Sequence, residues 1–182
     1  MEDADLLHFR PARISDAAAI AELHADSWRR HYRGAYADAY LDGDIETDRM
    51  AVWTDRLNTA TDRDQTQLAE EQGAVVGFVH TILRKDPAWG ALLDNLHVTY
   101  LRKRSGIGAQ LLKLSAEFVV DQAPGSGLYC GCWSKISQLR RSTRRSVAPA
   151  WNAVWCRIPV AYRAGSTVHR HACATPGPNP AS

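Results

Sequence analysis

The last third of this 182-residue chain contains no aspartate or glutamate. All 20 acidic residues lie at or before Asp121, whereas residues 122–182 carry eight of the 22 lysines and arginines. The first 121 residues therefore have a formal charge of −6 and the remainder +8. With acids at roughly one residue in eight, such a gap would arise about once in a few thousand trials. The character of the sequence changes near residue 130.

Several features that define other classes of protein are also absent. No run of about 18 apolar residues is present, so we expect no membrane-spanning helix and no membrane partner. The first residues have no basic start followed by an apolar stretch, so we expect no secretory signal and a cytoplasmic location. The length suits one domain with a core that needs no disulfides.

No cysteine precedes Cys130, so every cysteine lies in the basic part of the chain. The candidate zinc ligands there are Cys130, Cys132 and Cys156, or His169, His171 and Cys173. Neither set has a standard zinc spacing, so we expect no metal. The Arg140–Arg145 cluster could bind nucleic acid through its charge. No aromatic platform or helical pattern accompanies it, which favours a solvated basic segment without a nucleic-acid partner.

Hydrophobic periodicity predicts α/β order, with the later strands largely antiparallel. One helix is expected to begin at Ser15 as N-cap, and a second after Asp44 with Met50, Trp53 and Leu57 on one side. The other predicted elements are strands at 6–10, 65–70, 74–83 and 91–98 and a helix from Ile107 to about Val119. From Tyr129 the periodicity fades.

A basic turn with two glycines joins the strand ending at Val98 to the following helix. The free N–H groups and partial positive charge of a helix N-terminus attract phosphate. Gly106 and Gly108 let the backbone approach a ligand closely, and the preceding Arg102–Arg104 adds charge. The alternative is an ordinary strand-to-helix turn. The chain has no P-loop and no third glycine of a dinucleotide fingerprint, so the pattern favours the pyrophosphate of a coenzyme-A-type ligand.

Lys103-Arg-Ser-Gly106-Ile-Gly108 resembles the [RQ]-x-x-G-x-[GA] signature of the GNAT superfamily of N-acetyltransferases, with lysine at the first position. Three further segments resemble that family in the same order: Leu7–Asp16, Ala69–Val79 and Leu93–Val98. The resemblance covers about residues 6–121. It implies a mixed, largely antiparallel central sheet flanked by helices, with the C-terminal strand-helix-strand part missing or scrambled.

The resemblance also implies that an amine attacks the thioester of acetyl-CoA. The acceptor would be a primary amine of a small molecule or a peptide. The implied acetyl-CoA contacts are the backbone of Leu96, His97 and Val98, which would meet the pantetheine arm or the acetyl carbonyl, and the pyrophosphate-binding residues Lys103, Arg104, Ser105, Gly106, Ile107, Gly108 and Ala109.

Proton transfer has weaker candidates, because relatives carry a glutamate where this chain has Leu92. Asp94 is the nearest acid and His97 the nearest imidazole. Either could be a catalytic acid or base, or simply a surface carboxylate and a packed strand histidine. Four aromatic residues lie where the family places its acceptor-side helices and could line the acceptor site or pack in the core: Trp28, Tyr32, Tyr36 and Tyr40.

Residues 1–128 therefore form the expected acetyltransferase domain, and 129–182 an atypical basic tail. The tail lacks the family pattern L-x-V-x-x-x-N-x-x-A-x-x-F-Y-E. A shifted reading frame can be tested, in which each codon combines the last base of one residue's codon with the first two bases of the next. This frame permits the family pattern. Tyr129 into Cys130 and Cys132 into Trp133 then both give leucine, and the later positions permit the rest. We hypothesise that the tail from about Cys130 is translated from a shifted frame.

Three functions follow from these observations. The first is an active N-acetyltransferase, the second a catalytically defective acyl-CoA-binding remnant, and the third a basic-tailed nucleic-acid-binding protein. Loss of the last strand and helix would expose one edge of the sheet. We therefore expect low stability, or a homodimer that covers the edge.

Overall fold

The computed structural model of the protein describes residues 7–135 and 151–158. One six-stranded sheet runs through it in the order β1-β2-β3-β4-β5-β6, antiparallel throughout except for the parallel pair β4 and β5. The strands are β1 (His8–Pro11), β2 (Asp64–Glu71), β3 (Ala74–Asp86), β4 (Gly90–Val98), β5 (Leu128–Lys135) and β6 (Trp151–Ile158). The helices are α1 (Ala17–His31), α2 (Asp38–Asp42), α3 (Ile45–Asn58) and α4 (Ile107–Gln122), with short 3-10 turns at Ile14–Asp16 and Tyr100–Arg102.

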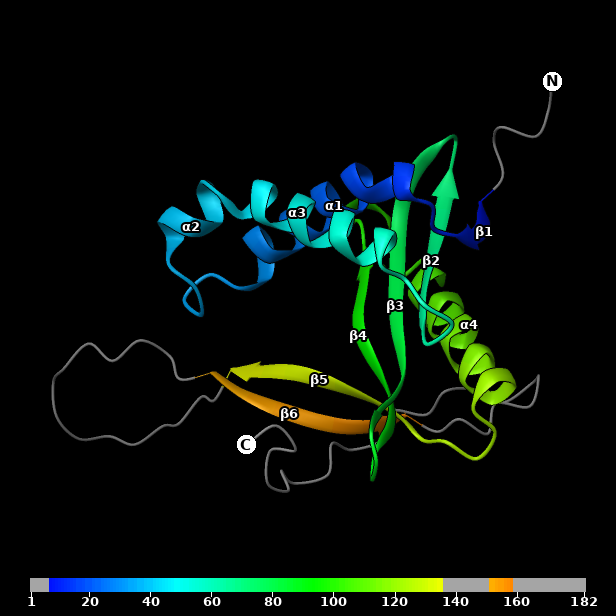
Figure 1. Ribbon diagram of the computed structural model, residues 1–182. Coiled ribbons are helices and arrows are strands. Elements are labelled where there is room, and N and C mark those ends of the chain that lie inside the picture. The colour runs from blue at the N-terminus through cyan, green and yellow to red at the C-terminus, as the bar shows by residue number, and fades with distance from the viewer. Residues whose placement is uncertain (1–6, 136–150, 159–182) are drawn as a thin grey trace, which may run out of the picture.

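Helices cover both faces of the sheet (Figure 1). On one face the apolar side of α4, with Ile107, Leu111 and Val119, packs on β2, β3 and β4. On the other face α1 and α3 pack together over Leu68 and Phe78. The predicted α/β class and largely antiparallel sheet are confirmed.

One local expectation is wrong. Ser15 does not cap α1, because a 3-10 turn precedes that helix and Asp16 is the N-cap residue. The Asp16 carboxylate instead accepts the Arg13 backbone N–H and pairs with Arg10, and these bonds hold the Asp16 pKa below its ordinary value. Met50 is 41% exposed although Trp53 on the same helix is fully buried.

A β-bulge interrupts the pairing of β3 with β4. Leu93 lies opposite Thr81 and Asn95 opposite His80, so Asp94 is an extra residue with no partner of its own. Because side chains alternate along a strand, one extra residue exchanges the faces of all that follow. Leu93 packs on the α4 side, and beyond the bulge His97 is turned toward α1.

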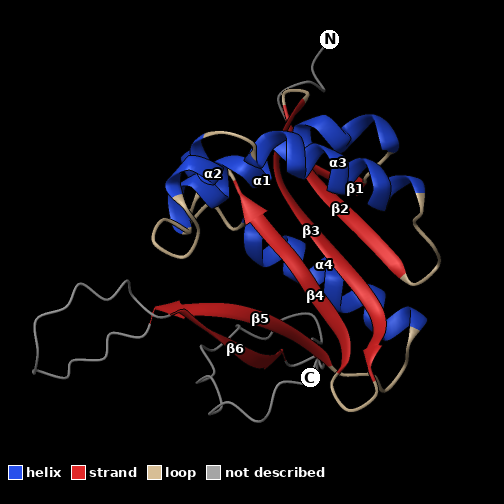
Figure 2. Ribbon diagram, turned by 60° about the vertical axis from the view of Figure 1, so that its left-hand side comes forward, coloured by secondary structure: helices blue, strands red, loops and turns tan. Residues whose placement is uncertain are grey.

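Strands β4 and β5 separate soon after they meet (Figures 1 and 2). Their pairing covers only Ala91 to Leu93 against Leu128 to Cys130. Within the described residues, Asn95 to Val98 of β4 pair with β3 alone. Strands β5 and β6 lie in the part of the chain where the sequence periodicity fades, and β5 pairs with part of the edge of β4. The Arg140–Arg145 cluster and the candidate ligands His169, His171 and Cys173 lie outside the described residues.

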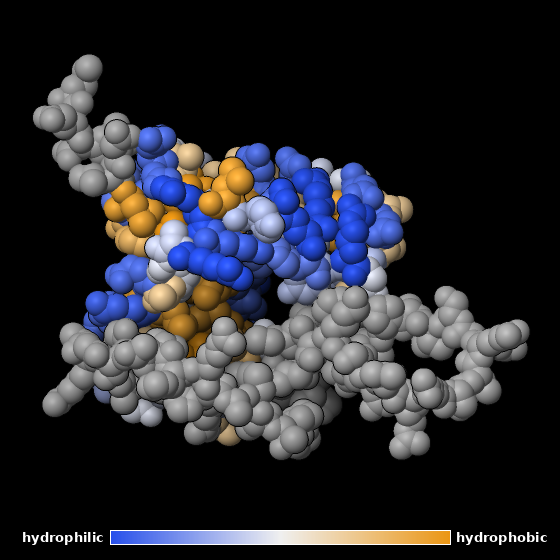
Figure 3. Space-filling model, turned by 180° about the vertical axis from the view of Figure 1, so that it is seen from behind, coloured by the Kyte–Doolittle hydropathy of each residue, from blue (hydrophilic) through white to orange (hydrophobic). Residues whose placement is uncertain are grey.

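Hydrophilic residues cover much of the helical end of the molecule when it is seen from behind (Figure 3). In the described part of the chain, no helix has both the length and the apolar character needed to cross a bilayer.

Candidate functional site

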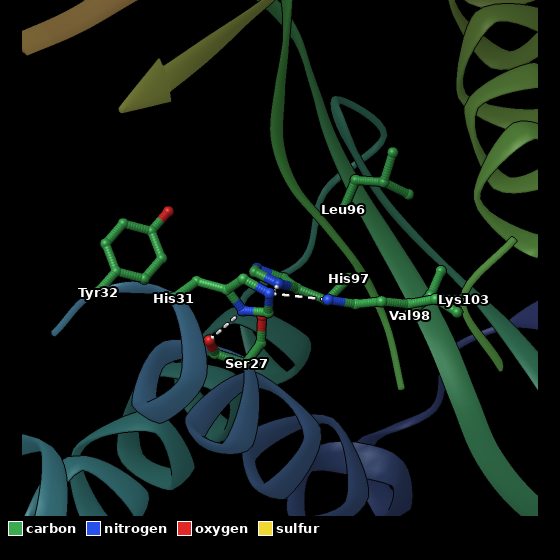
Figure 4. Close-up of a pocket in the computed structure, with 7 residues that line it drawn as sticks. All are labelled: Ser27, His31, Tyr32, Leu96, His97, Val98 and Lys103. Atoms are coloured by element: carbon green, nitrogen blue, oxygen red, sulfur yellow. Dashed lines mark hydrogen bonds between the residues drawn. The ribbon is translucent and has the colours of Figure 1, made fainter. Parts of the chain in front are cut away.

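A pocket of about 350 Å³ opens where α1 ends beside the second half of β4 (Figure 4). The edge of β4 away from β3 has no partner strand there among the described residues. One wall is the C-terminal end of α1, and the other is the end of β4 with the turn that follows it. The lining residues are Ser27, His31, Tyr32, Leu96, His97, Val98 and Lys103. The structure thus brings together Tyr32, three β4 residues and Lys103, which the sequence predicted as parts of one site.

His97 connects the two walls of the pocket. Its Nδ1 lies 2.8 Å from the Ser27 hydroxyl, and its ring lies against Phe78 with centroids 5.2 Å apart. Burial lowers the pKa of His97 to about 4, with a smaller contribution from His31. The imidazole is therefore neutral at neutral pH.

Two further buried histidines continue this layer behind His97. His24 of α1 accepts a hydrogen bond at Nδ1 from the Trp53 indole N–H, 3.0 Å away, and its ring centroid is 4.6 Å from that of His97. His80 of β3 has Nδ1 2.8 Å from the Thr66 hydroxyl. Burial also lowers the pKa of both, to about 2 for His24 and about 4 for His80.

Ser27 and His31 are the pocket residues that sequence reasoning missed. They are four residues apart on α1, so they share one face of the helix. His31 Nδ1 lies 2.7 Å from the Ser27 carbonyl oxygen, and His31 Nε2 lies 2.8 Å from the Lys103 ammonium. The i, i+4 spacing of Ser27 and His31 beside the predicted aromatic segment was the available signal.

The turn into α4 has the geometry of an anion cradle. Arg104 and Gly106 both have left-handed backbone, with φ of +66° and +85°, and Gly106 is the N-cap residue. The N–H groups that begin a helix have no partner inside it. Gly108 lies against Val98, since a Cβ added to it would be 3.7 Å from a Val98 methyl.

The basic residues of this turn differ in what they contact. The Arg102 guanidinium pairs with Glu71 at the end of β2, and Ser105 donates its hydroxyl to the Arg102 carbonyl. Lys103 reaches His31. Arg104 makes no ion pair with any residue that the structure describes. Lys103 and Arg104 are therefore the side chains best placed to meet an anion.

Asp94 lies apart from the pocket lining. Its carboxylate accepts hydrogen bonds from Arg56 of α3 and from Asn95, both at 2.6 Å. The bulge accounts for this arrangement, because it places the side chains of both Asp94 and Asn95 on the α3 side of the sheet.

The four predicted aromatic residues form a chain of contacts beside the pocket. Trp28 stacks on Tyr36 with centroids 4.9 Å apart and contacts Tyr32 at 5.2 Å, and Tyr36 contacts Tyr40 at 6.1 Å. The Arg49 guanidinium lies over the Trp28 ring, 4.6 Å from its centroid. The Tyr40 hydroxyl donates to Asp48. Of the four, Tyr32 reaches the pocket itself.

Solved structures share this architecture. The PaiA N-acetyltransferase of Thermoplasma acidophilum, in complex with coenzyme A, superposes with a TM-score of 0.60 at 18% identity, covering 72% of this chain and 82% of that one. The chain has the GNAT fold. The yncA protein of Salmonella typhimurium, solved with its cofactor acetyl-CoA, gives a TM-score of 0.57 at 15% identity and covers 91% of this chain and all of that one.

A curated protein resembles this chain in sequence. The uncharacterized N-acetyltransferase YuaI of Bacillus subtilis (strain 168) is 28% identical over 114 residues. The match spans 62% of this chain and 64% of the relative. No protein-family model matches the chain.

Proposed function

We propose that the protein is an N-acetyltransferase that transfers the acetyl group of acetyl-CoA to a primary amine of a small molecule or a peptide. One observation carries the proposal. The half of β4 that pairs with β3 but not with β5 lies beside the glycine turn that opens α4, with a pocket between β4 and the end of α1. Proteins of the same fold are named N-acetyltransferases and were solved with coenzyme A or acetyl-CoA.

The proposed acetyl-CoA site uses backbone groups more than side chains. A free edge of β4 at Leu96–Val98 offers N–H and C=O groups to the amide-rich pantetheine arm. The first turn of α4 offers its N–H groups and partial positive charge to the pyrophosphate. The fit is favourable at Gly106, because a Cβ placed there would meet no atom within 4 Å. That open space lies where the ligand would approach.

The reaction then requires direct attack of the amine on the thioester carbonyl. The electron pair of the new C–N bond displaces the carbonyl π pair onto oxygen, and backbone N–H groups stabilise the resulting oxyanion. Fixed amides of this kind typically contribute about 3 kcal/mol to transition-state stabilisation. Collapse of the intermediate breaks the C–S bond, and a proton goes to the departing thiolate.

His97 fits a positioning role better than that of a base toward an ammonium. Its pKa of about 4 lies roughly six units below that of an alkylammonium such as lysine. Full proton transfer would therefore cost about 8 kcal/mol. As a neutral imidazole bonded to Ser27, His97 can orient groups in the pocket. Asp94 keeps its proposed role in proton transfer only if Arg56 releases it.

The acceptor would approach past the aromatic residues at the end of α1. Tyr32 lines the pocket, and Trp28 and Tyr36 extend the aromatic surface away from it. Tyrosine and tryptophan rings bind both apolar stems and ammonium groups. This surface suits an amine carried on an apolar or aromatic body.

Two measurements test the proposal. Calorimetry should detect acetyl-CoA binding, and a thiol-release assay with a panel of amines should detect turnover. Binding without turnover would indicate the defective remnant, and absence of binding in well-folded protein would rule out both. A cytoplasmic location, a homodimer and a shifted frame from about Cys130 stay predictions, and sequencing the gene decides the last of these.

A further inference from the structure

His31 has a defined tautomer in this structure. The Lys103 ammonium can only donate, so His31 Nε2 accepts its hydrogen bond at 2.8 Å. His31 Nδ1 therefore carries the ring proton and donates it to the Ser27 carbonyl oxygen at 2.7 Å. When a backbone carbonyl accepts the N–H of one imidazole nitrogen, the other nitrogen presents an oriented lone pair. That lone pair already holds one ammonium group, that of Lys103.

The pocket has few other groups that could take a proton. No carboxylate lines it among the described residues. His97 has its Nδ1 engaged by Ser27, and Asp94 is held by Arg56. The charged or titratable groups facing His31 are Lys103 from the turn after β4 and His97 from β4, with Tyr32 next to it on its own segment. His31 Nε2 is thus the pocket nitrogen whose lone pair already faces an ammonium group, that of Lys103.

We propose that His31 is the general base of the reaction and that Lys103 occupies its Nε2 until the coenzyme binds. The inference rests on the proposed function. The pyrophosphate at the Gly106 turn attracts the Lys103 ammonium three residues earlier, and this leaves His31 Nε2 free. The acceptor ammonium then takes the place that the Lys103 ammonium held.

The proton balance of the step is simple. The acceptor ammonium gives one proton to His31 Nε2 and becomes the neutral amine. Its lone pair forms the C–N bond, and the tetrahedral intermediate then carries a positive nitrogen and an oxyanion. Breaking the C–S bond restores the carbonyl, and the proton on nitrogen ends on the coenzyme sulfur. Imidazolium returns the first proton to water, so the net products are amide, free thiol and one proton.

A structural role of His31 at the C-terminus of α1 is the competing explanation, since basic residues there bond to the last carbonyls. The substitution His31→Gln separates the two roles. The glutamine amide can still donate to the Ser27 carbonyl, but it cannot take a proton from an ammonium. His8 of β1, half-exposed and paired with Glu70, gives the matched control His8→Gln.

The decisive measurement is kcat/KM for two acceptors, an alkylamine and a hydroxylamine that is already neutral at neutral pH. With the alkylamine, H31Q should lose about 100-fold in kcat/KM at neutral pH. With the hydroxylamine, H31Q should stay near wild type, and H8Q should match wild type with both. An equal loss with the two acceptors, or no loss with the alkylamine, overturns the inference. Wild-type turnover reports on the proposed function, whereas the ratio between acceptors reports on His31 alone.

Lys103 has its own test. K103M should weaken acetyl-CoA binding in calorimetry but, at saturating acetyl-CoA, keep the alkylamine turnover that H31Q loses. Lys113 of α4, which pairs with Glu117 along the same helix, provides the control K113M with unchanged binding. In ¹⁵N NMR of the wild type, His31 should show the Nδ1-protonated form, and coenzyme A should shift its Nε2 resonance. An unchanged resonance at saturating coenzyme A would exclude the exchange of partners by Lys103.

Discussion

Acid should destabilise this protein well above the pH at which carboxylates titrate. His24 and His80 are 2% and 4% exposed, and His97 lies behind Ser27 in the same layer. Burial lowers the pKa of all three from 6.5, to about 2, about 4 and about 4 respectively. In the unfolded chain they take up protons as the pH falls through about 6.5, but in the folded protein they do not. The unfolded state therefore binds more protons, and stability falls as the pH falls.

The size of the effect follows from this linkage. Between about pH 7 and about pH 5.5, each neutral buried histidine costs the folded state about 1 kcal/mol relative to the unfolded chain. The three together cost roughly 4 kcal/mol. That is a large part of the roughly 5–15 kcal/mol by which domains of this kind are stable. The ion-paired Asp16, whose pKa lies below 3.8, contributes to acid lability only at lower pH.

Urea unfolding followed by circular dichroism at several pH values measures the effect. The free energy of unfolding should drop over this range without a change in the urea dependence. The variant His80→Gln keeps a partner for the Thr66 hydroxyl but removes one titrating group, so its drop should be about two-thirds of the wild-type drop. Equal stability at the two pH values would refute the assignment of three neutral buried histidines.

Five further substitutions test the packing and the glycine turn at Gly106. G106A and G73A impose the same left-handed backbone strain without a steric clash, at φ of +85° and +78°. Each should therefore lower the free energy of unfolding by about 1 kcal/mol. Only G106A should also weaken acetyl-CoA binding in calorimetry. T81V removes a buried hydroxyl pair with Ser115 and should lower the free energy of unfolding by about 1–3 kcal/mol, and adding S115A should recover part of it in a double-mutant cycle. G77A places a Cβ 3.1 Å from two side chains of α4 and should cost about 1–3 kcal/mol in thermal or urea unfolding; a neutral result would mean that α4 is packed less closely.

Much of the fold follows from local patterns. The Gln72-Gly73 turn, with positive φ at both residues, closes the predicted hairpin of β2 and β3. The predicted helix after Asp44 begins there, and the glycine turn at Gly106 opens α4 as expected. These features depend on residues close in the chain, where backbone preferences and hydrophobic periodicity act directly. The short helix α2 was missed, because five residues give too few turns for a periodic signal.

The candidate site depended on contacts between distant segments. The sequence by itself predicted that a turn with two glycines, Gly106 and Gly108, joins a strand to the helix α4. Only the tertiary structure placed His97 on the α1 side, because a single bulged residue at Asp94 exchanges the faces of the strand beyond it. It also brought His31 of α1 to Lys103, 72 residues away, and no local pattern encodes that contact. The local sequence thus predicts the glycine turn that opens α4. The groups that would move protons beside it depend instead on how α1 crosses β4.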